Sequence, residues 1–322
     1  MLRIVFMGTG EIAIPSLQWL LRGKAPDLEV VGVFTQPDKK VGRGQVLTSP
    51  KVKVLAEERG IPVFQPTRLR GNDGALAQAE SLHADINVVM AYGQMLPKKL
   101  IETPAIACVN LHASLLPRHR GASPIQAAIR EGDPESGITL MHMTKALDAG
   151  DIILSRSLPI RPGETGGSLH DRLASLGPDI LEEGLPLLAA GIAPRTRQDQ
   201  SLITVSGKLS REDGEIRWSE PAEKIERLIR AYDPWPGTHT FIQEEDSRAR
   251  QLKIFPATKV GPADGQPPGT VKVADGNLII SCGQGSTLIL HGDLQLEGRK
   301  RLSTAEFLRG ASFGTTRKLG KK

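Results

Sequence analysis

An amide and an imidazole interrupt an apolar stretch in the first half of the sequence, where Cys108–Leu111 leads to His112. If this stretch is a β-strand that ends in a loop, its period of two places Asn110 and His112 on one face. Both side chains then lie at the carboxyl end of a strand, where open α/β folds bind their ligands. Burying such groups is costly unless they are used or hydrogen-bonded, so the pair marks a candidate site. A structural histidine bonded in the core remains the alternative.

An acidic turn supplies a third group. The sequence Leu147-Asp148-Ala149-Gly150-Asp151 lies between two apolar runs. A carboxylate close to His112 would orient the imidazole and stabilise its protonated form. The set suits acyl transfer to an amine, because the amide and the imidazole can stabilise an oxyanion while a water between Asp148 and His112 carries away the proton. No nucleophilic Ser or Cys is required, and the alternative for Asp148 is a turn former or helix cap.

Alternating strand-like and helix-like segments surround these residues in the first half of the chain. The strand-like segments are Leu2–Met7, Val30–Thr35, Ile86–Tyr92, Ala107–Leu111 and Gly137–Met143. The helical segments are Ile14–Arg22, Pro50–Arg59, Gly74–Leu82 and Pro124–Arg130, and Ser168–Leu188 is typical of one longer helix. Such alternation predicts an α/β fold with a Rossmann-like, doubly wound and mostly parallel sheet.

The second half of the chain differs in composition and in the pattern of its segments. Residues 191–208 are polar and predict a linker between a domain over 1–190 and a domain over 209–322. After the linker, Pro221–Tyr232 has helical spacing. The short strand candidates that follow are His239–Ile242, Gln251–Phe255, Thr270–Val273, Leu278–Ser281 and Thr287–Leu290. They predict a small β-barrel.

Charge and cysteine content narrow the function classes. The net charge is +5, but the stretch from Gly298 onward has eight basic residues and one acid, so the rest of the chain is slightly acidic. A basic end suits a polyanion such as RNA, although a solvated tail is the alternative. Only Cys108 and Cys282 occur, without metal-ligand spacing, and no apolar run is long enough for a membrane helix. We therefore expect no metal, no membrane contact and a reducing, cytoplasmic location.

A glycine motif near the start allows a second hypothesis. Gly8-Thr9-Gly10 and Ala13 follow a strand and open a helix, which fits a dinucleotide-binding fingerprint. The acid expected at the end of the next strand is missing there, since Val33-Phe34-Thr35-Gln36 has none. We therefore favour the alternative that the glycines permit a tight strand-to-helix turn.

The run Asn110-Leu-His-Ala-Ser-Leu-Leu-Pro-Arg-His-Arg-Gly-Ala-Ser-Pro-Ile125 resembles the signature of the folate-dependent formyltransferases. The segments Ala91-Tyr92-Gly93 and Leu147–Asp151 add to this resemblance. It implies a catalytic trio of Asn110, His112 and Asp148, with 10-formyltetrahydrofolate as the formyl donor. It also implies a pterin pocket that is formed largely by backbone groups, from Met90, Tyr92, Gly93, Ser114, Leu115, Leu116 and Pro117.

The second half is similar to that of the methionyl-tRNA formyltransferases, notably at Arg217-Trp218 and Ile229–Thr238. That resemblance implies an OB-like C-terminal barrel that helps to bind methionyl-initiator tRNA. The implied tRNA contacts are Arg43, in a loop that reaches the acceptor end, and Arg299, Lys300 and Arg301 in the basic end. Gln45-Val46 stand where many relatives have lysines.

Three other functions stay open. An N-formyltransferase for a nucleotide-linked aminosugar would use the same trio and ignore tRNA. An inactive RNA-binding module would have kept only the fold, and a hydrolase would release formate from the folate without an amine.

Overall fold

The computed structural model describes residues 1–22, 27–42, 44–242, 249–310 and 317–320, and the chain divides into two compact units. The first unit comprises Met1–Pro124, Glu135–Leu158 and His170–Ser206. The second comprises Gly207–Lys322 together with two short earlier segments, Ile125–Pro134 and Pro159–Leu169. Most of the segment that we expected to be a linker thus groups with the first unit.

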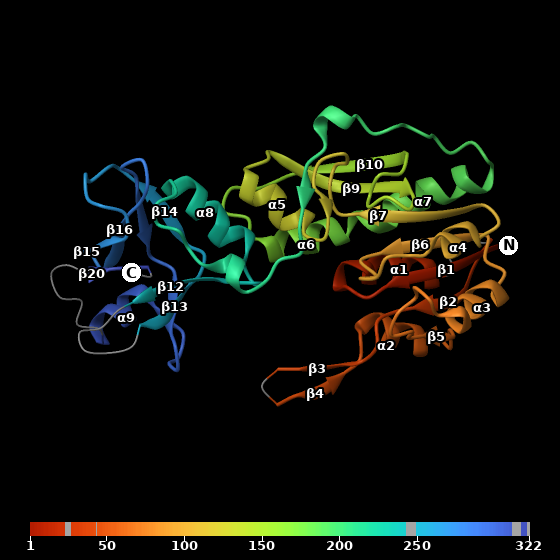
Figure 1. Cartoon of the computed structure of the whole chain (residues 1–322), viewed down its shortest axis with the longest axis horizontal. Helices are drawn as coiled ribbons and strands as arrows, with labels where there is room; N and C mark the ends of the chain where they lie inside the picture. The colour runs from red at the N-terminus through yellow and green to blue at the C-terminus, as the bar shows by residue number, and fades with distance from the viewer. Residues whose placement is uncertain (23–26, 43, 243–248, 311–316, 321–322) are drawn as a thin grey trace. The chain divides into compact units, whose positions relative to one another are not determined.

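A seven-stranded sheet forms the centre of the first unit, with the strand order β10-β9-β7-β6-β1-β2-β5 (Figure 1). The strands are β1 (Leu2–Gly8), β2 (Leu28–Phe34), β5 (Val63–Phe64), β6 (Ile86–Met90), β7 (Ala107–His112), β9 (Glu135–His142) and β10 (Ile152–Pro159). The run from β7 to β5 is parallel, and β9 pairs with β7 antiparallel. This arrangement confirms the predicted α/β class. Every residue of β6 and β7 is buried, as expected for parallel strands that are covered on both faces.

Helices cover both faces of this sheet. The helices of the first unit are α1 (Ile14–Leu21), α2 (Lys51–Glu57), α3 (Asp73–Ser81), α4 (Lys98–Glu102) and α7 (Leu176–Ala189). α5 (Pro124–Glu131) belongs almost entirely to the second unit, and α6 (Gly166–Ala174) is divided between the two units. Leu76 of α3 and Leu100 of α4 share one buried cluster with Cys108 of β7. On the opposite face, Gly177 of α7 lies against Ser16 of α1 and Leu111 of β7. Since Cys108, Asn110 and His112 alternate with Leu111, the two polar residues share the face of Cys108.

The single helix predicted over Ser168–Leu188 is wrong in one respect, because the chain forms two helices there. α6 ends at Ala174 and α7 begins at Leu176. Pro178 explains the interruption: it has no N–H to donate to the carbonyl of Ala174, and its ring would clash with that carbonyl in a continuous helix.

The loop predicted to reach the acceptor end contains a short hairpin of β3 (Lys39–Val41) and β4 (Val46–Thr48). Its first strand follows Asp38, whose carboxylate accepts hydrogen bonds from Gln65 Nε2 (2.7 Å), Lys53 Nζ (3.0 Å) and Ser49 Oγ (2.9 Å). These donors lower the pKa of Asp38 to about 2. The base of the hairpin is therefore anchored to the first unit by an ionised carboxylate.

The turn after β1 is packed too tightly for larger side chains. A Cβ on Gly8 would lie 2.7 Å from the Phe6 ring and 3.1 Å from the Met90 carbonyl oxygen. Thr9 Oγ1 donates to the Tyr92 carbonyl oxygen (2.9 Å) and accepts from the Gln36 N–H (3.1 Å). These contacts give the glycine motif a structural role in the loop, as favoured from the sequence.

The second unit is β-rich. Its strands are β12 (Thr238–Ile242), β13 (Arg250–Ile254), β14 (Thr258–Gly261), β15 (Thr270–Ala274), β16 (Asn277–Ser281), β17 (Thr287–Leu290), β18 (Asp293–Leu296), β19 (Leu302–Ser303) and β20 (Arg317–Lys318). They form one sheet in the order β12-β13-β18-β19 and another in the order β14-β17-β16-β15-β20. Both sheets, α8 (Ala222–Ala231) and α9 (Thr304–Gly310) contribute to one apolar core. This is the small, barrel-like domain expected from the sequence.

Candidate active site

β7 brings Asn110 and His112 to the same face at its carboxyl end. Asn110 pairs with Met141 and His112 with Thr139 of the antiparallel neighbour β9. Both residues are almost fully buried, with 8% and 6% of their surface exposed. Within the part of the chain that the structure describes, the side-chain amide of Asn110 has no hydrogen bond. Its two N–H donors therefore remain available to a bound group.

The hydrogen bonding of His112 defines its tautomer. Its Nε2 lies 2.9 Å from the carbonyl oxygen of His119. A carbonyl oxygen only accepts, so Nε2 must carry the proton in this contact. In the neutral ring, Nδ1 is then the nitrogen with a free lone pair, and it faces Asp148 with 3.7 Å to Oδ2. The imidazole therefore lies between a carbonyl oxygen on one side and a carboxylate on the other.

Asp148 reaches His112 from the turn after β9. Its Oδ2 accepts a hydrogen bond from the Gly121 N–H (2.8 Å), which fixes the carboxylate beside the ring. Asp148 has a φ of 48°, a left-handed conformation that few non-glycine residues adopt. A Cβ on Gly150 would lie 1.7 Å from the His142 carbonyl oxygen, so only glycine allows this turn to pack against β9. The structure thus brings Asp148 beside His112, and Asn110 lies on the same face of β7 as His112.

The loop after β7 contains Ser114, Leu115, Leu116 and Pro117, and Thr139 of β9 holds it in place. Thr139 Oγ1 donates to the Ser114 carbonyl oxygen (2.7 Å) and accepts from the Leu116 N–H (3.2 Å). Ser114 Oγ donates to the Arg118 carbonyl oxygen (2.7 Å). Thr139 was not among the predicted site residues, because nothing in the sequence of a largely buried strand marks one threonine as a loop anchor.

Met90 is the last residue of β6, and Tyr92 and Gly93 follow shortly after it. The side chains of Met90 and Tyr92 are buried, and Tyr92 packs in the core beside Phe34 and Leu100. Burial raises the pKa of Tyr92 to about 12. Since these side chains point into the core, a ligand at this segment would meet its backbone, as the resemblance implied.

The four predicted tRNA contacts differ in their surroundings. Arg43 lies outside the described residues. Arg299 and Lys300 are exposed after β18. Arg301 is engaged within the second unit, since its Nε is 2.7 Å from Asp293 Oδ2 and its guanidinium carbon lies 3.7 Å from the centre of the Phe255 ring. Arg301 therefore has a packing role that the sequence did not reveal.

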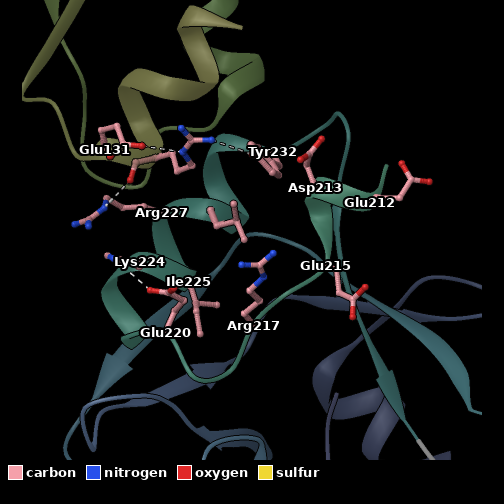
Figure 2. Close-up of a pocket in the computed structure, with 12 residues that line it drawn as sticks. Glu131, Glu212, Asp213, Glu215, Arg217, Glu220, Lys224, Ile225, Arg227 and Tyr232 are labelled. Atoms are coloured by element: carbon pink, nitrogen blue, oxygen red, sulfur yellow. Dashed lines mark hydrogen bonds and ion pairs between the residues drawn. The ribbon is translucent and has the colours of Figure 1, made fainter. Parts of the chain in front are cut away.

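A cavity of about 660 Å³ lies in the second unit, between α8, the segment before it and the end of α5 (Figure 2). Five acidic and four basic side chains line it. Several are already paired, such as Arg130 with Glu131 (2.9 Å) and Lys224 with Glu220 (3.2 Å). A lining with balanced, paired charges does not attract a polyanion, and none of the three candidate catalytic residues lies in it.

Two further observations concern metals and membranes. Among the described residues, no group of three or more His, Cys, Asp or Glu side chains could hold a metal ion. In the same part of the chain, no helix is both long and apolar enough to cross a bilayer.

The chain is similar to known proteins over nearly its whole length. Residues 2–185 match the formyl transferase family, and residues 208–312 match the formyl transferase C-terminal domain. The methionyl-tRNA formyltransferase of Akkermansia muciniphila is 49% identical over 310 residues, which cover 96% of each chain. That of Geotalea daltonii is 44% identical and covers 100% of this chain and 99% of its own.

Solved structures share the fold at lower identity. An N-formyltransferase from Helicobacter canadensis, crystallised with folinic acid and dTDP-3-aminofucose, is 19% identical with a TM-score of 0.66, covering 90% of this chain and 99% of its own. HypX from Aquifex aeolicus, in complex with tetrahydrofolic acid, is 17% identical with a TM-score of 0.59, covering 97% of this chain and 48% of its own. These two likenesses concern the fold alone. The full-length matches above are decisive, and the chain belongs to the methionyl-tRNA formyltransferase family.

Proposed function

We propose that this chain transfers the formyl group of 10-formyltetrahydrofolate to the amino group of methionyl-initiator tRNA, and that Asn110, His112 and Asp148 carry out the transfer. One observation supports these roles above all others. The His112 ring is fixed between the His119 carbonyl oxygen at Nε2 and Asp148 at Nδ1. A histidine with one nitrogen engaged and the other facing a carboxylate can take up and release a proton without moving.

The reaction begins when the neutral amine attacks the formyl carbon. The carbon becomes tetrahedral and its oxygen acquires negative charge. The Asn110 amide and the protonated His112 ring stabilise that oxygen, and Asp148 stabilises the imidazolium. The carbon–nitrogen bond to the folate then breaks. Protonated His112 gives a proton to the folate nitrogen as that bond breaks, and it then accepts, through Asp148 and a water molecule, the proton that the attacking nitrogen loses. The products are tetrahydrofolate and formyl-methionyl-tRNA.

Binding of the donor is assigned to backbone groups of Met90–Gly93 and of Ser114–Pro117. The anchoring of the second loop by Thr139 supports this assignment, because a loop that is already held loses little freedom when a ligand binds. The backbone N–H and carbonyl groups of such segments suit the fused ring of a pterin, which presents both donors and acceptors.

Binding of tRNA is assigned to Arg43, Arg299 and Lys300, with Arg301 adding charge while it stays paired to Asp293. Exposed cations suit a phosphate backbone. We also propose the division into a catalytic domain over 1–190, a linker over 191–208 and a tRNA-binding domain over 209–322, although most of that linker packs on the first unit.

A set of parallel assays tests the proposal. Formyl transfer is measured with methionyl-initiator tRNA, methionyl-elongator tRNA, a nucleotide-linked aminosugar and no acceptor. We expect rapid transfer to the initiator tRNA alone. Faster transfer to the aminosugar would replace the proposed acceptor, and formate release without an acceptor would indicate a hydrolase. An absence of activity in all four assays would favour the inactive RNA-binding module.

A further inference from the structure

The connecting segment, residues 191–206, leads from α7 to the start of the second unit and folds back onto the first. Thr196 forms a β-bridge with Ile152, at the start of β10. Further along, β11 (Val205–Ser206) pairs in parallel with β8 (Arg120–Gly121). A chain that merely joined two domains would not need such pairing, so the buried polar groups of this segment point to a further role.

Gln198 is a buried polar residue of this segment, with 6% of its surface exposed. Its Nε2 donates to the carbonyl oxygens of Asp148 and Gly150, both at 2.8 Å. Its Oε1 accepts from the Arg120 guanidinium, at 3.0 Å to Nε and 2.7 Å to Nη2. Carbonyls only accept and a guanidinium only donates, so an amide is the one side-chain group that satisfies both sides.

The position of these bonds is significant because Asp148 has a left-handed backbone. Non-glycine residues keep such a conformation only when their surroundings hold it. Gln198 binds the carbonyl oxygens on either side of Ala149. It therefore closes the turn that carries Asp148, whose carboxylate faces His112.

The connecting segment reaches the Asp148 carboxylate by a second route. The Arg120 N–H donates to the Thr204 carbonyl oxygen (2.9 Å), and the Ala122 N–H donates to the Ser206 carbonyl oxygen (2.9 Å). Between them, the Gly121 N–H points the other way and donates to Asp148 Oδ2. A Cβ on Gly121 would lie 2.3 Å from the Ser206 carbonyl oxygen, so the two strands require glycine there.

A third route leads to the other side of the imidazole. Thr204 Oγ1 accepts from the His119 N–H (2.8 Å) and lies 3.3 Å from His119 Nδ1. His119 is buried, with a φ of 57°, and its carbonyl oxygen is the partner of His112 Nε2. The same segment therefore holds both groups that flank the His112 ring.

We propose that the connecting segment is a working part of the active site and that Gln198 is a positioning residue, which sets Asp148 against His112 through the turn backbone. The inference rests on the proposed role of Asp148. Gln198 itself lies outside the reacting groups, so its loss should lower the rate of transfer without weakening the binding of either substrate.

The first experiment replaces one half of the amide. In Gln198→Glu, an oxygen still accepts from Arg120, while the other oxygen repels the two carbonyls. We expect kcat to fall by about tenfold to a hundredfold, the range for a small misplacement of reacting groups. KM for 10-formyltetrahydrofolate and for methionyl-initiator tRNA should stay within about twofold.

Asn87→Asp is the matched control. Asn87 is a buried amide of β6 with 2% exposure, and its Nδ2 donates to the Leu100 carbonyl oxygen (3.3 Å). The same amide-to-carboxylate change there should lower the thermal midpoint and leave kcat unchanged. An equal fall of kcat in both variants would mean that Gln198 has only a structural role and would overturn the proposal.

A double-mutant cycle tests whether Gln198 acts through Asp148. Single-turnover rates are compared for Gln198→Glu, Asp148→Ala and the double variant. If the proposal holds, the double variant is no slower than Asp148→Ala. Losses that multiply would overturn it. If Asp148→Ala retains the full rate, the proposed catalytic role fails first, so the two failures can be distinguished.

A second pair of variants keeps the test valid if Gln198→Glu does not fold. Thr204→Val removes the hydroxyl that holds His119, and Thr204→Ser keeps it. We expect Thr204→Val to lower kcat with KM unchanged, and Thr204→Ser to restore most of the rate. Equal rates in the two variants would contradict the positioning role of the segment.

Discussion

The surroundings of His112 are assigned the formyl transfer itself, and the basic stretch Arg299–Arg301 is assigned the binding of tRNA. The two regions are built differently. Around His112, each flanking group has a hydrogen-bonding partner, and the ring is almost fully buried. In the basic stretch, Arg299 and Lys300 are exposed, and only Arg301 is paired. Bond-making requires groups that are fixed before the substrate arrives, whereas attraction of a polyanion requires only charge.

The largest effect on the rate should come from a change in the surroundings of His112. In His112→Ala we expect kcat to fall by roughly 10²–10³-fold, because a developing oxyanion loses a fixed donor. Steady-state kinetics with both substrates checks this, with His291→Ala as a control at an exposed histidine of the second unit. A variant within about twofold of the parent rate would remove His112 from the mechanism.

A change of the backbone should also be costly in this region. Gly150→Ala adds a Cβ that would lie 1.7 Å from the His142 carbonyl oxygen, so the turn that carries Asp148 must shift. We expect kcat to fall by about tenfold to a hundredfold, and stability to decrease by about 1–3 kcal/mol. Gly310→Ala, where a Cβ meets nothing within 4 Å, is the control for both measurements. Parent-like kinetics in Gly150→Ala would mean that the turn can move without affecting catalysis.

The basic stretch should respond more weakly and in a different quantity. Arg299→Gln combined with Lys300→Gln should weaken tRNA binding severalfold and reduce the slope of its salt dependence by about 1 per residue, with kcat and folate affinity unchanged. Lys272→Gln, at an exposed lysine of β15, is the matched control. If tRNA affinity and its salt slope do not change, these two residues are not contacts.

Arg301 belongs to the basic stretch but, like the groups around His112, is paired within its unit, so its replacement should affect stability. Because it pairs with Asp293 and covers the Phe255 ring, Arg301→Gln should lower stability by about 1 kcal/mol, as measured by denaturant unfolding. Arg299→Gln provides the comparison and should have little effect on unfolding. Equal unfolding curves for the two variants would deny Arg301 its packing role.

The smallest effect, on stability at acid pH, concerns Asp38. Its carboxylate is hydrogen-bonded, and it lies outside both regions. Its pKa is lowered from 3.8 to about 2, so its contribution to stability is present above about pH 4 and is lost as the pH falls toward 2. When the pH is lowered from about 6 to about 3, the thermal midpoint of Asp38→Asn should therefore fall by less than that of the parent protein. The same acid sensitivity in both proteins would show that the carboxylate is not held by its three donors.

Local patterns made part of this account predictable from the sequence. The period of two in Cys108–His112 placed Asn110 and His112 on one face, and α8 followed from its helical spacing. Pro178 accounts for the break between α6 and α7, because it cannot donate a hydrogen bond to the carbonyl four residues earlier. Pro186 lies inside α7 without ending it, so a proline in the sequence does not by itself locate the break.

The parts that could not be predicted depend on contacts between distant residues. Gln198 binds the backbone carbonyls of Asp148 and Gly150, and backbone groups leave no trace in the sequence of their partner. The polar composition of residues 191–208 indicates a linker as readily as a segment that packs on a catalytic turn. The pairing of Arg301 likewise needs the strands around it to be in place.

The most direct test of the central claim is a single-turnover comparison of His112→Ala, Asp148→Ala and the variant with both changes, with methionyl-initiator tRNA as acceptor. If the carboxylate acts through the imidazole, the double variant should be no slower than His112→Ala, because groups that work as a unit are lost together. Rate losses that multiply, or an Asp148→Ala variant at the parent rate, would contradict the account.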